Sequence, residues 1–125
     1  MSDTKRPSYF LRPSAERGAP MQAVFELEGV KSVLYLNSIG ELAIHKLGRN
    51  SRPNKKPIAQ GQAVQNPDQG EDYPDLVGLV TTAKGTVFEL AFWFHDDPIR
   101  PYYVVRYSKR PVPQGSVYRP ESIAA

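Results

Sequence analysis

The sequence predicts an all-β protein, either a small antiparallel, partly open barrel (OB-like) or a sandwich, with roughly five to six strands. Twelve prolines and nine glycines interrupt the 125 residues too often for long helices. Between these breaks the chain is rich in aromatic and β-branched residues, which favour strands. The barrel is the better interpretation, because closing a sheet removes the edges through which sheets aggregate.

The first half of the domain contains three predicted strands. They cover residues 22–28, 31–37 and 41–47. In the first of them, Phe25 and Leu27 alternate with glutamates, which is the pattern of a half-buried strand. The four residues 37–40 form a turn between the second and third strands, and Gly40 can take the positive φ that such turns need.

The second half repeats this arrangement, with strands predicted at residues 76–82, 86–95 and 102–108. Residues 83–85 make a tight turn between the first two of these strands. Along the longest strand, the aromatic residues Phe88, Phe92 and Phe94 share one face with Leu90, so this face is expected to be core. The opposite face carries Trp93 and His95 and is expected to meet solvent or a partner.

We therefore expect one folded domain at residues 21–110, with a flexible arm at 1–20 and a tail at 111–125. Within the arm, Tyr9–Leu11 form a small apolar plug that can dock on the domain or on a partner. Residues 48–74 are expected to form a long central loop, because proline and glycine recur along them. Basic residues lie near the start of this loop and acidic residues lie near its end. This is also the pattern of a solvated loop whose opposite charges partly compensate each other.

Several classes of protein are excluded or disfavoured by composition. The chain has no cysteine, so it has neither disulfides nor thiolate metal sites, and this fits a reducing bacterial cytoplasm. No apolar run approaches the ~20 residues of a membrane helix. The first residues lack the apolar segment of a signal peptide. A net charge of +3 permits a polyanionic partner without requiring one.

No catalytic pattern is present, and we expect neither enzymatic activity nor a cofactor. The sequence lacks the glycine-rich phosphate loops, the nucleophile elbow and the metalloprotease motif. His95, Asp96 and Asp97, with His45, have the side chains of metal ligands. Adjacent residues of an extended chain point to opposite faces, however, so the cluster is interpreted as a polar strand end without a metal.

The remaining signal is the mixture of cations and aromatic rings late in the chain. Between Arg100 and Arg119 basic residues alternate with tyrosines, and no acid occurs. Single-stranded nucleic acid is bound by this combination, because cations contact phosphates and flat rings stack on bases. The predicted stacking residues are Trp93, Tyr102, Tyr103 and Tyr107, and the predicted phosphate contacts are Lys55, Lys56, Arg100, Arg106, Lys109 and Arg110. The pattern also suits an ordinary sheet, in which tyrosine is common and charged strand ends prevent edge pairing.

Residues 54–108 carry short motifs that resemble small uncharacterised β-rich proteins of phages and plasmids. The motifs are Lys55-Lys56-Pro57, the Pro-Asp-x-x-Gly sequence at Pro74–Gly78, and the Ala-x-Trp sequence at Ala91–Trp93, followed by a last short strand. This chain departs from the pattern at Phe92 and in the longer segment at 58–71. The resemblance implies an origin in a mobile element and a β-barrel or strand-binding role.

Together these observations predict a non-enzymatic protein that binds single-stranded DNA or RNA and comes from a phage or another mobile element. The alternative is a protein-binding inhibitor or adaptor that docks on a host protein complex. In that case an exposed sheet edge or the 48–74 loop would contact the partner. No membrane partner is expected. The sequence does not distinguish DNA from RNA.

Overall fold

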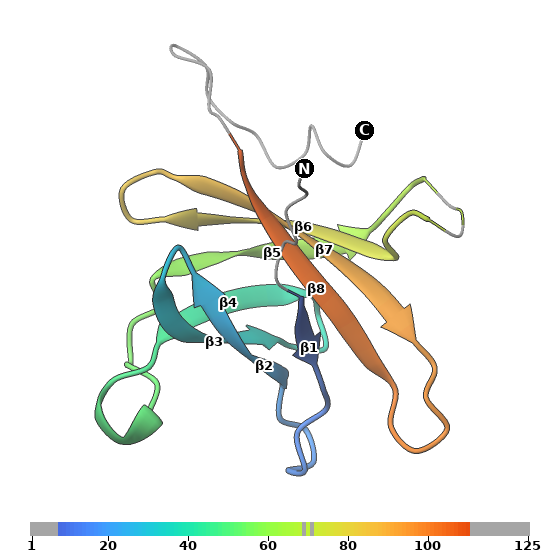
Figure 1. Cartoon of the computed structure of the whole chain (residues 1–125), viewed down its shortest axis with the longest axis horizontal. Coiled ribbons are helices and arrows are strands. Elements are labelled where there is room, and N and C mark those ends of the chain that lie inside the picture. Colours follow the sequence, from blue (N-terminus) through green and yellow to red (C-terminus); the bar gives the residue numbers. More distant parts are fainter. Residues whose placement is uncertain (1–7, 69, 71, 111–125) are drawn as a thin grey trace.

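The computed structural model describes residues 8–68, 70 and 72–110, which form one curved sheet of eight strands (Figure 1). One short 3₁₀ turn, η1, covers Arg49–Ser51. The strands are β1 (Tyr9–Leu11), β2 (Met21–Leu27), β3 (Val30–Leu36), β4 (Glu41–Lys46), β5 (Ala59–Gln65), β6 (Leu76–Thr82), β7 (Val87–His95) and β8 (Tyr102–Arg110). No helix in the described part of the chain has the length and apolar character needed to cross a membrane.

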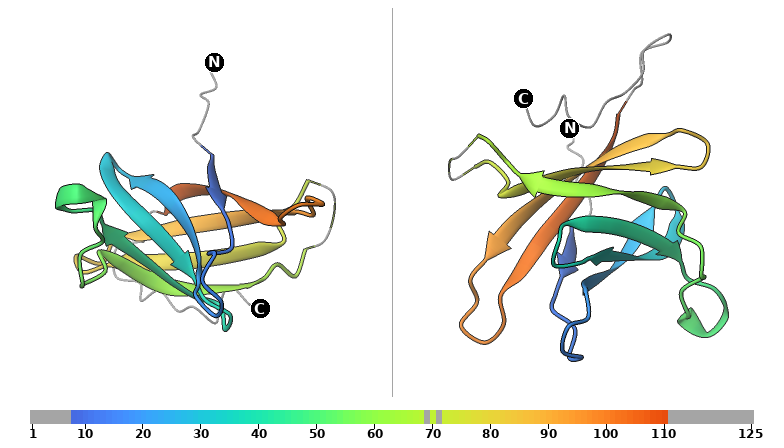
Figure 2. Two further views of the ribbon diagram at one scale, coloured as in Figure 1. Left: turned by 90° about the horizontal axis from the view of Figure 1, so that it is seen from below. Right: turned by 180° about the vertical axis from the view of Figure 1, so that it is seen from behind.

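The strands are arranged as an up-and-down barrel. From β2 to β8, each strand pairs antiparallel with the next in sequence, and β8 then pairs with β1. The ring is completed where β1 meets β2, because Arg12 and Gln22 exchange two backbone hydrogen bonds of 3.1 and 2.9 Å. Two further views show the sheet curling round on itself (Figure 2).

Successive connections alternate between the two ends of this barrel. We call one end the mouth; its loops are residues 12–20, 37–40, 66–75 and 96–101. We call the other end the base; its connections are residues 28–29, 47–58 and 83–86, and β8 also finishes there. In Figure 1 the base lies toward the left and the mouth toward the right and lower edge.

The interior is packed by alternate residues of every strand. Phe25, Phe88 and Phe92 are the largest side chains that are fully buried. Burying a side chain of this size stabilises the fold by roughly 1.5–3 kcal/mol. The inward residues of β5 are small instead: a Cβ at Gly61 would lie 1.6 Å from the carbonyl oxygen of Leu79, so only glycine fits there.

Two tyrosine hydroxyls hold the seam of the barrel, where β2 meets β1 and β8. The hydroxyl of Tyr9 donates a hydrogen bond of 3.1 Å to the carbonyl of Glu26. The backbone N–H of Glu28 donates one of 2.9 Å to the hydroxyl of Tyr107. The ring of Phe25 lies between them, with centroids 4.5 Å from Tyr9 and 5.2 Å from Tyr107. Because β1 has only three residues, side-chain hydrogen bonds replace most of the strand pairing here.

The structure confirms the predicted all-β antiparallel class, in the barrel form rather than as a sandwich. The sheet has eight strands instead of five or six, and its simple up-and-down order differs from the Greek-key order of an OB fold. The six strands expected from the sequence are all present, with ends shifted by no more than two residues. Gly40 has the expected positive φ, 89°.

Two segments expected to lack regular structure contain the additional strands. In the 48–74 segment β5 is a full strand, although its sequence is mostly small and polar, because it pairs along both edges with β4 and β6. In the 1–20 arm β1 is fixed by its pairing with β8, and Leu11 is completely buried. The predicted tail at 111–125 and the arm's first residues, 1–7, lie outside the described residues.

We expect Tyr107→Phe and Tyr9→Phe each to lower the free energy of unfolding by roughly 0.5–1.5 kcal/mol, because each removes one hydrogen bond of the seam and keeps the ring. Urea denaturation followed by circular dichroism measures this loss. The control is Tyr73→Phe, since Tyr73 is 55% exposed in the loop between β5 and β6. If both seam variants were as stable as this control, the hydroxyls would not hold the barrel closed.

Candidate nucleic-acid interface

Aromatic and cationic side chains gather on the outer surface of three adjacent strands, β1, β8 and β7. The strand register sets Phe10 and Trp93 on either side of Val104, and sets His95 beside Tyr102. We call this surface the outer aromatic face. Its members are Phe10, Arg12, Trp93, His95, Tyr102 and Arg106.

Tyr102 is the centre of the half of this face that lies nearer the mouth. The His95 ring stacks on the Tyr102 ring at 5.1 Å with an angle of 9° between their planes, and Phe10 lies 5.9 Å away on the neighbouring strand. The guanidinium of Arg12 lies over both rings, at 5.5 Å from Phe10 and 5.7 Å from Tyr102. One cation therefore lies directly beside two aromatic rings, and one of these rings also stacks on His95.

Arg106 and Trp93 form the other half of the face. The guanidinium of Arg106 lies 5.8 Å from the indole of Trp93, and its Nε donates a hydrogen bond of 3.0 Å to the hydroxyl of Ser8. A cation over a ring at an exposed site contributes about 0.5–1 kcal/mol, so such contacts orient the guanidinium without removing it from solvent. Arg106 remains exposed, and Trp93 is half-buried.

Two of the predicted stacking residues face the interior instead. Tyr103 packs against Phe92 and Phe94, and Tyr107 packs against Phe25 and Phe88. Side chains alternate along a strand, and Val105 between the two tyrosines is completely buried. The expectation that all four stacking residues share one surface is therefore corrected: Trp93 and Tyr102 lie outside, and Tyr103 and Tyr107 lie inside.

The predicted phosphate contacts are also divided by the barrel. Lys55 and Lys56 are in the connection between β4 and β5, on the side of the ring opposite β8. Lys109 and Arg110 lie where β8 reaches the base, and the Arg110 guanidinium forms an ion pair of 3.1 Å with Glu89. Of the predicted cations, Arg106 alone has a guanidinium in contact with a ring of the outer aromatic face.

Arg100 lies in the mouth loop between β7 and β8, next to this face. The Asp97 carboxylate accepts hydrogen bonds from the backbone N–H groups of Ile99, at 2.8 Å, and Arg100, at 3.2 Å. These two bonds lower the pKa of Asp97, so its carboxylate stays ionised and the turn stays formed at neutral pH. The turn connects His95 to Tyr102 and brings Arg100 to the edge of the face.

Sequence reasoning missed Phe10, Arg12 and the role of His95 in this face. The available signal was the apolar plug Tyr9–Leu11, since a strand with Leu11 inside necessarily turns Phe10 outside. His95 stacks on Tyr102, whereas His45 lies on β4 with its Nδ1 2.7 Å from the carbonyl oxygen of Asn54. No group of three or more potential metal ligands occurs within residues 8–68, 70 and 72–110.

Charge is separated between the two ends of the barrel. The strand β5 runs from base to mouth, so the basic first part and the acidic second part of the 48–74 segment lie at opposite ends. Charged groups at the base are mainly basic: Lys31, Lys46, Arg49, Arg52, Lys55, Lys56, Lys84, Lys109 and Arg110, with Glu26, Glu28 and Glu89. Those at the mouth are mainly acidic: Glu16, Glu41, Asp68, Asp72, Asp75, Asp96 and Asp97, with Arg12, Arg17 and Arg100.

No family model matches the chain, and no curated protein or solved structure is similar enough to count as a match. Inferences about function therefore depend on the chemistry and geometry of the surfaces described above.

The inward orientation of Tyr103 leads to a prediction for alkaline pH. Burial raises the pKa of Tyr103 above 10.0, and the Asp75 carboxylate raises it further. As the pH rises through 10.0, the unfolded chain loses this proton before the folded chain does, so the free energy of unfolding falls. We expect Tyr103→Phe to reduce that fall.

Urea denaturation of wild type and variant at about pH 8 and about pH 11 measures the difference, because tyrosine ionises near ~10. Burial of Tyr9 raises its pKa too, so part of the pH dependence remains in the variant. An identical loss of stability in the two proteins would mean that the Tyr103 hydroxyl is not shielded from water.

Proposed function

We propose that this protein binds single-stranded nucleic acid on its outer aromatic face and carries out no chemical step. The strand is sequestered or presented, with bases stacked on the rings of Trp93, Tyr102 and Phe10. Arg12, Arg106 and Arg100 contact its phosphates. The resemblance of residues 54–108 to proteins of mobile elements supports a phage or plasmid origin, with the protein acting in the cytoplasm of a bacterial host.

The observation that carries this proposal is the gathering of flat rings and guanidinium groups on one outward surface. Each base stacked on an aromatic side chain contributes roughly 1–3 kcal/mol, and any base can stack because every base has a π-face. Phe10 is 48% exposed although it is large and apolar. Exposed clusters of this kind are typical of interaction sites.

A single strand suits this surface better than a duplex does. The rings need base faces that are free to stack, and these are available in single strands and loops. The described residues contain no α-helix that could enter the major groove of a duplex. The outer side of β8 offers a continuous track from Tyr102 past Arg106 toward Arg110, about 26 Å long at ~3.3 Å per residue.

The number of cations on the face sets the expected salt dependence. Three guanidinium contacts to a single strand give a slope of about −2 in a plot of log affinity against log salt concentration. Between about 50 and 200 mM salt the affinity then falls by about 15-fold. This fall is smaller than that expected if the cations at the base also took part.

We expect an oligonucleotide of about 12 nucleotides to quench the fluorescence of Trp93, the only tryptophan, at low salt. Tyr102→Ala should weaken binding by roughly 1–3 kcal/mol, which is about 5- to 150-fold, because it removes one stacking ring. Tyr73→Ala is the matched control, since this exposed tyrosine lies in another loop. Titrations with DNA and RNA strands of the same sequence show which is preferred.

We expect the double variant Arg12→Gln/Arg106→Gln to reduce the salt slope by about 1.4, because ~0.7 is lost for each phosphate contact. Its control is Lys55→Gln/Lys56→Gln, which changes the net charge equally but on the opposite side of the barrel. Anisotropy of a dye-labelled strand measures both, independently of Trp93. Binding that depended on the lysines instead of the arginines would assign the strand to the base of the barrel.

The second candidate function is that of a protein-binding inhibitor or adaptor. Aromatic residues and arginine are enriched in the cores of protein interfaces, so the outer aromatic face also suits a protein partner. The absence of Trp93 quenching by both DNA and RNA at low salt would contradict strand binding and favour this candidate.

A further inference from the structure

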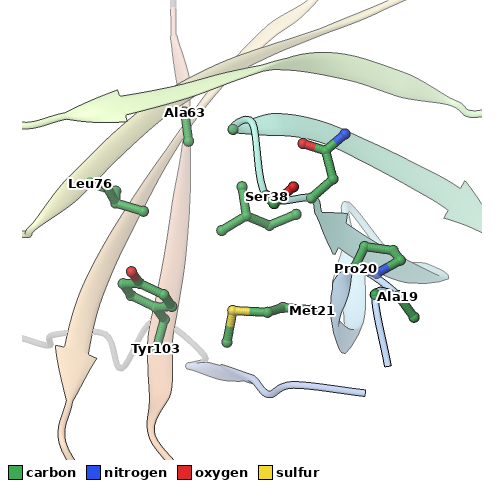
Figure 3. A pocket seen from close by; sticks show the side chains of 11 residues that line it. Ala19, Pro20, Met21, Ser38, Ala63, Leu76 and Tyr103 are labelled. Atoms are coloured by element: carbon green, nitrogen blue, oxygen red, sulfur yellow. The ribbon is translucent and has the colours of Figure 1, made fainter. Parts of the chain in front are cut away.

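The mouth of the barrel holds a cavity of about 460 Å³ that is separate from the outer aromatic face. This volume is within the roughly 300–1,000 Å³ of small-molecule sites. Figure 3 shows Ala63, Leu76 and Tyr103 along one side of the cavity and Met21, Ser38 and Pro20 along the other. The interior of an eight-stranded barrel is either filled by side chains or leaves room for one small ligand.

The walls of the cavity are mostly apolar. Met21, Leu36, Ala63 and Leu76 line it, and Gly18–Pro20 lie at its edge. Ala63 is buried and pairs with Gly78 on β6, and its backbone N–H donates a hydrogen bond to the carbonyl of Gly40. These small residues help to keep the space open. Such walls favour a ligand with an apolar body.

One polar group of the cavity wall, the Tyr103 hydroxyl, differs from the other tyrosine hydroxyls of the interior. The hydroxyls of Tyr9 and Tyr107, the other two tyrosines of the interior, hydrogen-bond to the backbone of the seam. The hydroxyl of Tyr103 has no hydrogen-bond partner among the residues that the structure describes. A ligand in the cavity can therefore bond to this hydroxyl without breaking a hydrogen bond within the described protein.

The charge around the cavity selects the kind of ligand. The mouth loops carry more carboxylates than cations, and among them Asp75 immediately precedes Leu76 in the wall. The Asp75 carboxylate contributes to the raised pKa of Tyr103, so its negative potential reaches the cavity. A protonated amine is favoured in this potential and a carboxylate is disfavoured.

We propose that the mouth cavity binds a small molecule with an apolar body and a protonated amine. The body packs between Met21 and Leu76, and the amine lies toward the Tyr103 hydroxyl and the carboxylates of the mouth. This site is independent of strand binding, because none of its residues belongs to the outer aromatic face.

The test uses three probes with the same aromatic body: 1-naphthylmethylamine, 1-naphthalenemethanol and 1-naphthoate. The chain has two methionines, Met1 and Met21, so protein labelled with ¹³C in the methionine methyl groups gives a simple spectrum with a reporter in the cavity wall. Met21→Leu assigns its resonance. We expect the amine to shift the Met21 resonance at the lowest concentration and to bind about tenfold more tightly than the carboxylate.

Variants then locate the site. Ala63→Leu fills the cavity and should abolish the shift, and Tyr103→Phe should weaken amine binding by roughly two- to tenfold because it removes the free hydroxyl. The matched control is Tyr107→Phe, on the same strand at the base, which should leave affinity unchanged. If no probe moved the Met21 resonance of the wild-type protein, or if the carboxylate bound as tightly as the amine, the proposal would be overturned whether or not Ala63→Leu folds.

Discussion

The closure of the barrel across the seam between β2, β1 and β8 is the constraint on which the other features depend. The Phe25 ring packs against Tyr9 and Tyr107, and the hydroxyls of these tyrosines bond to the backbone of Glu26 and Glu28. These contacts join β2 to β1 and β8. Once the ring is closed, every strand has one side that faces the core and one that faces solvent. This alternation decides which aromatic residues pack inside and which remain available to a partner.

The alternation divides the aromatic residues of β8 into two groups. Tyr103 and Tyr107 stabilise the interior, whereas Tyr102 lies outside with Trp93, Phe10 and two arginines. The same closed ring leaves space at the mouth, where β5 contributes small residues. The interior near the base is filled by rings, and the interior near the mouth is partly open. One closed sheet therefore supports two separate candidate sites, a convex one outside and a concave one within.

The sequence predicted the fold class and six strands, because those strands alternate or are rich in aromatic residues. It missed β5, whose small inward residues leave no apolar pattern, and β1, which is short and depends on β8 for its pairing. It predicted Trp93, Tyr102 and Arg106 for the site but not the inward orientation of Tyr103. On β8 both faces carry tyrosine and valine, so only pairing with the core residues of β7 distinguishes them. The side of the barrel on which Lys55 and Lys56 lie was not predicted either. It depends on the order of the strands in the sheet, and the unpredicted strand β5 changes that order.

The central claim is that a single strand lies across β1, β8 and β7 on the outer aromatic face. A ¹⁵N-labelled sample titrated with an oligonucleotide and followed by two-dimensional NMR tests it most directly. We expect the indole N–H of Trp93, the Nε–H groups of Arg12 and Arg106 and the amide of Tyr102 to shift together, while the amides of Lys55 and Lys56 do not. Shifts confined to the base loops or to the residues of the mouth cavity would contradict it.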